Sequence, residues 1–198
     1  MIKLILFDLG GVLFTDGTSK FIKSVSTRYN IPLERVSDIV NGELGLKYRE
    51  AQITRDEFWN QLVSKLSLTE KIIDLENEWI SYYELFEKTK EIIIKLKEKY
   101  KVYYLSNNVK ERAERLNEKF DYLKLFDGGV YSHEVKAIKP DPRIYEFALN
   151  KAGFPANETV FIDDKESSLE PARKMGIETI LFENSDKLEA DLIKLGVL

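Results

Sequence analysis

The strongest constraint on the fold is a short apolar run near the start of the chain that ends in an aspartate. Residues 2–8 (IKLILFD) are followed at once by Leu9, Gly10 and Gly11. A strand with apolar side chains on both faces is typical of the centre of a parallel sheet that helices cover on each side. The run therefore predicts an α/β fold whose first strand carries Asp8 at its carboxyl end.

Further short apolar segments repeat this pattern in the second half of the chain, and helical patterns separate them. The predicted strands are residues 102–105, the region around 129–131, 159–162 and 178–182. The predicted helices are residues 91–100, 109–119, 143–152 and 167–175. Gly153 and Gly176 follow the last two of these helices, as expected where a helix ends in a left-handed residue. This alternation predicts a Rossmann-like core with a mostly parallel sheet.

Residues 17–86 break the alternation, because they contain helical patterns and no strand. The helices expected there are residues 19–29, 33–40, 55–66 and 70–82. Thr54 and Glu57 have the spacing of a capping box, and Pro32 suits a helix start. We therefore expect two units, a catalytic core formed by residues 1–16 and 87–198 and an inserted helical cap formed by residues 17–86.

Composition narrows the kind of site that the chain can build. Its 198 residues include no cysteine and one histidine, His133, which excludes thiol chemistry and a multi-histidine zinc site. A metal would therefore be held by oxygen atoms, which favours Mg²⁺. The net charge of −4 is spread along the chain, and no basic stripe or long apolar segment is present. We expect no nucleic-acid partner, no membrane association and a cytoplasmic location.

Polar residues gather where the predicted strands end and in the loops beyond them. They are Asp8, Ser106 with Asn107, Lys139, and Asp163 with Asp164. Ligands of an open parallel sheet bind at the carboxyl ends of its strands, so these groups are expected at one edge. Carboxylates that hold Mg²⁺, together with a hydroxyl and an ammonium group, suit phosphoryl transfer. An aspartate can attack phosphorus to form an acyl phosphate that water then cleaves.

The order of four segments resembles the four motifs of the haloacid dehalogenase superfamily. The segments are FDLGGVL, LSNN, IKPDPRIY and FIDDKESSLEPARKMG, and the helical insertion lies where many members carry a cap. The resemblance implies a Mg²⁺-dependent hydrolase that acts on a small phosphorylated metabolite. It implies the following roles: Asp8 as nucleophile and metal ligand, the Gly10 carbonyl as metal ligand, Ser106 and Asn107 as phosphate-binding residues, Lys139 as charge stabiliser, Asp164 as direct metal ligand, and Asp163 beside it or acting through water.

One position departs from the pattern of the superfamily's phosphatases. They carry a second aspartate two residues after the nucleophile, which protonates the leaving oxygen, and this chain has Gly10 there. General acid–base catalysis contributes roughly 10²–10⁴-fold, so the absence matters. FDLG also resembles a branch of sugar-phosphate phosphatases that includes glucose-1-phosphate phosphatases, and an anomeric oxygen leaves more easily than an ordinary alcohol. Asp16, Glu50 or another residue of the cap is a candidate replacement donor.

Two alternatives remain open at this point. A 2-haloacid dehalogenase would use the same aspartate and needs no general acid, but the pair Asp163–Asp164 favours a metal and a phosphate over that reaction. A non-catalytic relative would bind a phosphorylated ligand without turnover.

The resemblance places cap loops that touch substrate near Lys47, Tyr48 and Arg49. His133 is expected to be structural or merely exposed and not to act as a general base. The expected assembly is a monomer or a homodimer.

Overall fold

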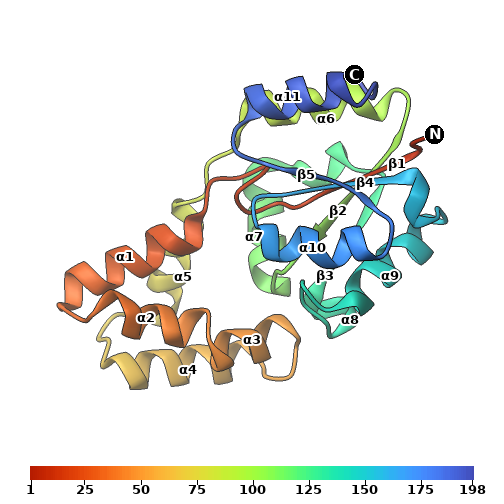
Figure 1. Ribbon diagram of the computed structural model, residues 1–198. Coiled ribbons are helices and arrows are strands. Elements are labelled where there is room, and N and C mark those ends of the chain that lie inside the picture. Colours follow the sequence, from red (N-terminus) through yellow and green to blue (C-terminus); the bar gives the residue numbers. More distant parts are fainter.

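The computed structural model describes residues 1–198 and contains a sheet of five parallel strands flanked by helices (Figure 1). The strands are β1 Leu4–Phe7, β2 Lys101–Ser106, β3 Gly128–Tyr131, β4 Thr159–Asp163 and β5 Glu178–Leu181. Their order across the sheet is β3-β2-β1-β4-β5. The α/β fold with a Rossmann-like parallel sheet is confirmed, and β1 lies at its centre, as the apolar run predicted.

Side chains of the central strand point alternately into two apolar layers. Ile5 and Phe7 belong to the larger layer, whereas Leu4 and Leu6 belong to the smaller one. All four are fully buried, because a strand with neighbours on both sides and helices on both faces has no solvent-facing surface. This packing fixes the direction of β1 and hence the place where its carboxyl end delivers Asp8.

Helices of the core cover the two faces of the sheet. The larger layer receives apolar residues from α6 Glu87–Lys97, α7 Lys110–Phe120 and α11 Ser185–Lys194. The smaller layer receives them from α9 Pro142–Ala152 and α10 Glu166–Lys174. Three short helical turns, η1 Tyr122–Leu125, α8 Ser132–Val135 and η2 Ala156–Glu158, lie in the connections. Gly153 ends α9 in a left-handed conformation, as its sequence position predicted.

The segment between β1 and α6 is entirely helical and extends to one side of the sheet (Figure 1). Its helices are α1 Gly17–Tyr29, α2 Leu33–Val40, α3 Glu43–Arg49, α4 Arg55–Leu66 and α5 Ile72–Ser81. The Thr54–Glu57 capping box is formed at the start of α4. The proposed cap boundaries, residues 17–86, stay a prediction.

Apart from the four-residue helix α8, two α-helices were not predicted from the sequence, α3 and α11. Helix α3 has only seven residues and follows Gly42, and Gly45 lies inside it, so its sequence resembles a loop. A Cβ at Gly45 would come within 1.8 Å of the Val40 carbonyl oxygen, which explains why glycine occupies this position. Helix α11 had a usable signal, because the Asn184 side chain accepts a hydrogen bond from the Lys187 N–H as an N-cap does.

Two connecting segments join the helical insertion to the core and pair with each other. The Phe86 N–H donates to the Leu13 carbonyl (2.9 Å), and the Thr15 N–H donates to the Glu84 carbonyl (2.9 Å). A further contact joins α3 to the core, because the Ser132 hydroxyl donates to the Arg49 carbonyl (2.7 Å). No helix of the structure is long and apolar enough to cross a membrane.

Candidate active site

The carboxyl edge of the sheet brings three predicted site residues into one place. Phe7 pairs with Ile162 of β4 and with Tyr104 of β2, so the next residue along β1, Asp8, lies beside the ends of both strands. Asp163 ends β4 and Ser106 ends β2. All three side chains are buried, and the sequence-based expectation of a common edge is confirmed.

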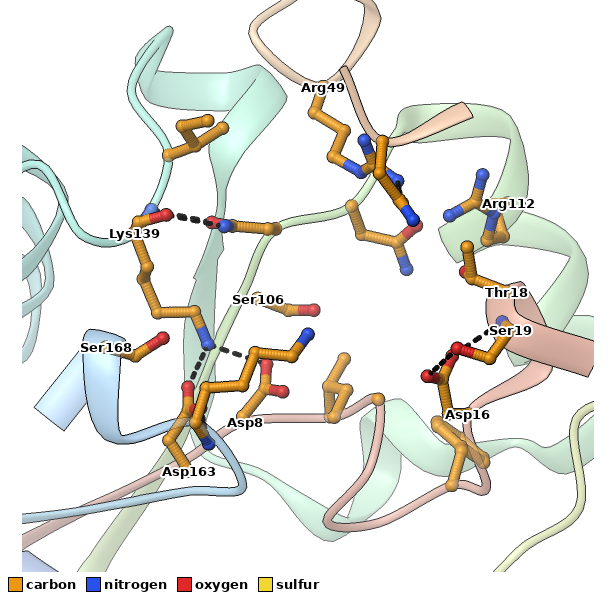
Figure 2. Close-up of a pocket in the computed structure, with 18 of the residues that line it drawn as sticks. Asp8, Asp16, Thr18, Ser19, Arg49, Ser106, Arg112, Lys139, Asp163 and Ser168 are labelled. Carbon is orange, nitrogen blue, oxygen red and sulfur yellow. Dashed lines mark hydrogen bonds and ion pairs between the residues drawn. The ribbon is translucent and has the colours of Figure 1, made fainter. Parts of the chain in front are cut away.

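Lys139 joins two of these carboxylates from the loop before α9 (Figure 2). Its Nζ lies 2.7 Å from Asp8 Oδ1 and 2.6 Å from Asp163 Oδ2. Burial opposes the charge on the ammonium group, but Asp163 and Asp8 outweigh this effect and raise the pKa of Lys139. The lysine is therefore a fixed positive charge at the floor of the site.

Burial dominates the protonation of the carboxylates themselves. It raises the pKa of Asp8 to about 6, against the opposing effect of Lys139, and Asp163 raises it further. Burial also raises the pKa of Asp164. The three carboxylates repel one another, and a bound cation would relieve that repulsion.

The carboxylates Asp8, Asp163 and Asp164 fit a divalent metal ion. One oxygen atom from each lies within 4.8 Å of the others. Asp164 Oδ1 is buried and has no hydrogen-bond partner, so it is available as a ligand. Asp163, in contrast, accepts hydrogen bonds on both oxygens, from the Lys165 N–H (2.8 Å) and from Lys139. An all-oxygen set of this kind suits Mg²⁺.

Asn107 lies beside this cluster and contacts Lys139. Its side-chain Oδ1 accepts from the Lys139 N–H (2.8 Å), and its Nδ2 donates to the Lys139 carbonyl (3.0 Å). Both polar groups of the side chain are therefore engaged in holding the lysine backbone. The resemblance to the superfamily predicts phosphate binding for Asn107, and the structure adds a positioning contact with Lys139 that the sequence pattern does not indicate.

Gly10 and Gly11 meet very different surroundings in the turn after Asp8. A Cβ at Gly10 would have no heavy atom within 4 Å, so the position has room for a side chain. A Cβ at Gly11 would lie 2.5 Å from Asp164 Oδ2, and the φ of +92° at Gly11 is one that favours glycine. The second glycine therefore allows the β1 turn to approach the Asp164 carboxylate closely.

The site opens into a cavity of about 410 Å³ between the sheet edge and the helical insertion. Figure 2 shows Asp8, Lys139 and Asp163 on one side of it, with Arg49 and Arg112 on another. Ser106 points its hydroxyl into the space that these side chains surround. Other polar residues that line the cavity include Asp16, Thr18, Ser19, Asn41, Asn108 and Lys165.

Some of the other residues predicted to contact substrate line the cavity, and others do not. Asp16 lines the cavity and caps α1 by accepting from the Ser19 N–H (3.0 Å), whereas Glu50 is not part of the lining. Of the three residues near the end of α3, Arg49 lines the cavity, and Tyr48 instead donates to Glu111 in the core (2.9 Å).

His133 does not line the cavity. Its Nδ1 lies 2.8 Å from the Asn108 carbonyl oxygen, and its ring stacks on Tyr131. This arrangement agrees with the expected structural role of His133.

Arg112 was missed, although its position was available from the sequence. It is the third residue of α7, the helix that follows β2, and the first turn of such a helix lies near the carboxyl edge of the sheet. The helix predicted at residues 109–119 therefore carried a usable signal for Arg112 in its first turn.

A comparison with known protein families identifies the family to which the chain belongs. The model of the haloacid dehalogenase-like hydrolases matches residues 5–182. The chain belongs to this family. The match includes all the residues of the carboxylate cluster and the inserted helices, and the chain is therefore a hydrolase of that type.

Two similar proteins come from Bacteroides thetaiotaomicron. A haloacid dehalogenase family enzyme, crystallised with magnesium and inorganic phosphate, has a TM-score of 0.78 and 27% identity, with 91% of this chain and 94% of that chain covered. A D-ribitol-5-phosphate phosphatase is 26% identical over 203 residues, which cover 93% of each protein. The L-2-haloacid dehalogenase of Xanthobacter autotrophicus shares the fold, with a TM-score of 0.67, 16% identity, and 100% of this chain and 85% of that chain covered.

Proposed function

We propose that this hydrolase is a Mg²⁺-dependent phosphatase that cleaves a small phosphorylated metabolite, with sugar phosphates as the leading class, through an aspartyl-phosphate on Asp8. The observation that carries the proposal is the buried cluster of Asp8, Asp163 and Asp164 around Lys139 at the floor of a polar cavity. The likeness to a relative named as a phosphatase and to a structure holding magnesium and phosphate supports it.

Asp8, Asp164 and the Gly10 carbonyl would hold the metal ion, with Asp163 beside them. When bound, Mg²⁺ supplies positive charge that offsets the repulsion between the phosphate and the carboxylates. The free oxygen of Asp8 attacks phosphorus, and the bond to the leaving oxygen breaks. Lys139 lies against the Asp8 carboxylate and stabilises negative charge on the transferring group, while Ser106 donates its hydroxyl to a phosphate oxygen. Water then cleaves the acyl phosphate and restores Asp8.

The proton for the leaving oxygen has no donor at position 10. A substrate whose leaving oxygen is already a good leaving group, such as the anomeric oxygen of a sugar 1-phosphate, needs this proton least. Asp16 lies in the cavity lining, where it is available as a weaker substitute, although its carboxylate already accepts from Ser19. The proposal therefore favours sugar 1-phosphates over simple alkyl phosphates.

The test is phosphate release from a panel of sugar, polyol and alkyl phosphates, measured with Mg²⁺ and with a chelator. Asp8→Asn is expected to reduce the rate by about 10⁴-fold or more, as loss of a nucleophile does in other hydrolases. Asp186→Asn is the matched control, because Asp186 is exposed and pairs with Lys88 away from the cavity. Equal rates in Asp8→Asn and the natural chain, or release that ignores the chelator, would overturn the proposal.

The dehalogenase alternative is favoured by one observation, the absence of an acid at Gly10, since halide leaves without a proton. It predicts halide release from 2-haloacids in the presence of chelator. If the protein released halide in the presence of chelator and released no phosphate, the dehalogenase function would replace the phosphatase function. A folded chain that binds phosphorylated compounds and turns over neither class would instead be a non-catalytic relative.

A further inference from the structure

Two arginines from different parts of the fold line the cavity away from the carboxylate cluster. Arg49 ends α3 in the helical insertion, and Arg112 lies in the first turn of α7 in the core. Figure 2 shows both side chains turned toward the cavity, opposite Asp8 and Lys139. A single ligand in the cavity can therefore contact the carboxylate floor and both arginines.

Hydrogen bonds and stacking hold the two guanidinium groups in place without neutralising them. Arg49 donates to the Val40 carbonyl (3.2 Å) and to Asn41 Oδ1 (3.2 Å), and neither acceptor is charged. The Arg112 guanidinium lies over the Trp79 ring, 4.0 Å from its centroid. Neither arginine forms an ion pair with a carboxylate of the chain, although most other arginines do.

The electrostatics of this pair are unfavourable without a ligand. Burial lowers the pKa of Arg49 to about 10, and the positive charge of Arg112 lowers it further. Tyr83 and Asp16 act in the opposite direction and raise this pKa, but Asp16 also serves as the N-cap of α1. A pair of like charges held together in a partly buried place gains most when an anion binds between them.

We propose that Arg49 and Arg112 form a second anion site, which selects substrates that carry a carboxylate or a second phosphate in addition to the phosphate that is cleaved. This inference rests on the proposed phosphatase function and narrows its substrate class to phosphorylated acids and bisphosphates. Arginine suits this role, because its planar fork donates two parallel hydrogen bonds to a carboxylate or a phosphate. The cavity lining also includes Thr18, Asn41 and Asn108, whose polar side chains suit the hydroxyl groups of a sugar chain.

The experiment compares pairs of substrates that differ in the second anion alone. The pairs are glucuronate 1-phosphate with glucose 1-phosphate, 3-phosphoglycerate with glycerol 3-phosphate, and glucose 1,6-bisphosphate with glucose 1-phosphate. In the natural chain, kcat/KM is expected to be about 10–100-fold higher for the member with the second anion, which is the range of one or two charge-assisted hydrogen bonds. The larger ratio, in the carboxylate or in the bisphosphate pairs, identifies which anion is the natural one.

Arg49→Gln and Arg112→Gln are expected to remove most of this ratio by lowering kcat/KM for the doubly anionic member only. Arg35→Gln is the matched control, because Arg35 lies in α2 of the same insertion, is exposed, and donates to the Lys65 carbonyl outside the cavity. It should keep the full ratio. A binding measurement needs no turnover: Asp8→Asn with Mg²⁺ should bind glucuronate 1-phosphate more tightly than glucose 1-phosphate, and adding Arg49→Gln should make the two affinities equal.

The outcomes separate this inference from the proposed function. Phosphate release with equal kcat/KM in all three pairs, or an unchanged ratio in both arginine variants, overturns the second anion site and leaves the phosphatase standing. Loss of activity toward both members of each pair in Arg49→Gln also overturns it, since that result indicates a general structural role. Absence of phosphate release from every compound overturns the phosphatase proposal itself.

Discussion

The floor and the far wall of the cavity carry opposite charge and are built differently. In the floor, Asp8, Asp163 and Asp164 lie around Lys139, and Asp8 and Asp163 form ion pairs with the lysine. The far wall carries Arg49 and Arg112, which have no carboxylate partner. Groups of the floor come from strand ends and the loops beside them, whereas groups of the wall come from helices. The floor is thus suited to a reaction step shared by every substrate, and the wall to the choice among substrates.

Among the changes that test this comparison, removing the lysine from the floor is expected to have the largest effect. Lys139→Met leaves Asp8 and Asp163 buried without their partner, which costs about 3–5 kcal/mol of unfolding free energy in the absence of metal. Phosphate release should fall by about 10³-fold for all substrates alike. Urea unfolding with and without Mg²⁺ measures the first effect, and a substrate panel measures the second.

Mg²⁺ is expected to change the stability of Lys139→Met by a different amount than the stability of the natural chain. Because a cation between the carboxylates replaces part of the lost charge, Mg²⁺ should stabilise Lys139→Met more than it stabilises the natural chain. Lys3→Met, which removes a half-exposed lysine paired with Glu158, is the control and should leave the Mg²⁺ effect unchanged. An equal gain in stability from Mg²⁺ in the Lys139 variant and the natural chain would show that the lysine and the metal do not share the same carboxylates.

The next largest effect is expected from Asn107→Ala, which tests whether Asn107 positions Lys139 or takes part in selecting the substrate. Asn107→Ala removes both hydrogen bonds to the Lys139 backbone, and kcat is expected to fall about tenfold, which corresponds to the net value of one or two hydrogen bonds. The loss should be the same for both members of each substrate pair, unlike the loss in Arg49→Gln.

Asn117→Ala is the control for this prediction. Asn117 accepts a hydrogen bond from the Leu123 N–H (3.0 Å) outside the cavity, so its loss should lower stability slightly and leave kcat unchanged. A loss of kcat in Asn107→Ala that is confined to doubly anionic substrates would show that Asn107 selects the substrate and does not act through Lys139.

Protons and Mg²⁺ are expected to compete for the floor. The pKa of Asp8, raised to about 6 by burial, lies above the ordinary value of 3.8, so the carboxylate gains a proton as the pH falls through about 6. A neutral Asp8 binds cations poorly, and Mg²⁺ affinity should weaken by up to about tenfold per pH unit below that point. Titrations with Mg²⁺ at pH 5, 6 and 7 check this, and Asp8→Asn should give a shallower dependence. An equally steep dependence in the variant would assign the proton to another group.

The different origins of the floor and the wall also explain which site residues could be predicted from the sequence. Asp8, Ser106 and Asp163 were predictable, because apolar runs mark the strands and the carboxyl end of each strand marks the edge. Strand order and the register of β1 with β2 and β4 were not in the sequence pattern, since pairing depends on contacts distant along the chain.

The wall was harder to predict for a different reason. Arg49 and Arg112 line the same cavity only because α3 contacts α7, where Tyr48 donates to Glu111, and a helical periodicity does not reveal which polar side chain faces a cavity. Helix α3 itself was obscured by Gly42 and Gly45, whose role is to allow close backbone approach. The engagement of Asn107 with Lys139 likewise depends on a loop conformation that no local pattern specifies.

The smallest expected effect comes from the two adjacent glycines, which form their own matched pair. Gly11→Ala forces a Cβ into a backbone conformation that L-residues disfavour by roughly 1–2 kcal/mol, and that Cβ would lie 2.5 Å from Asp164 Oδ2. Asp164 must then shift, so Mg²⁺ affinity should fall by about tenfold. Gly10→Ala adds the same methyl group to open space and should leave Mg²⁺ affinity within about twofold of the natural value. Titration of thermal unfolding with Mg²⁺ compares the two, and equal affinities would mean that the close approach of Gly11 to Asp164 does not set the metal site.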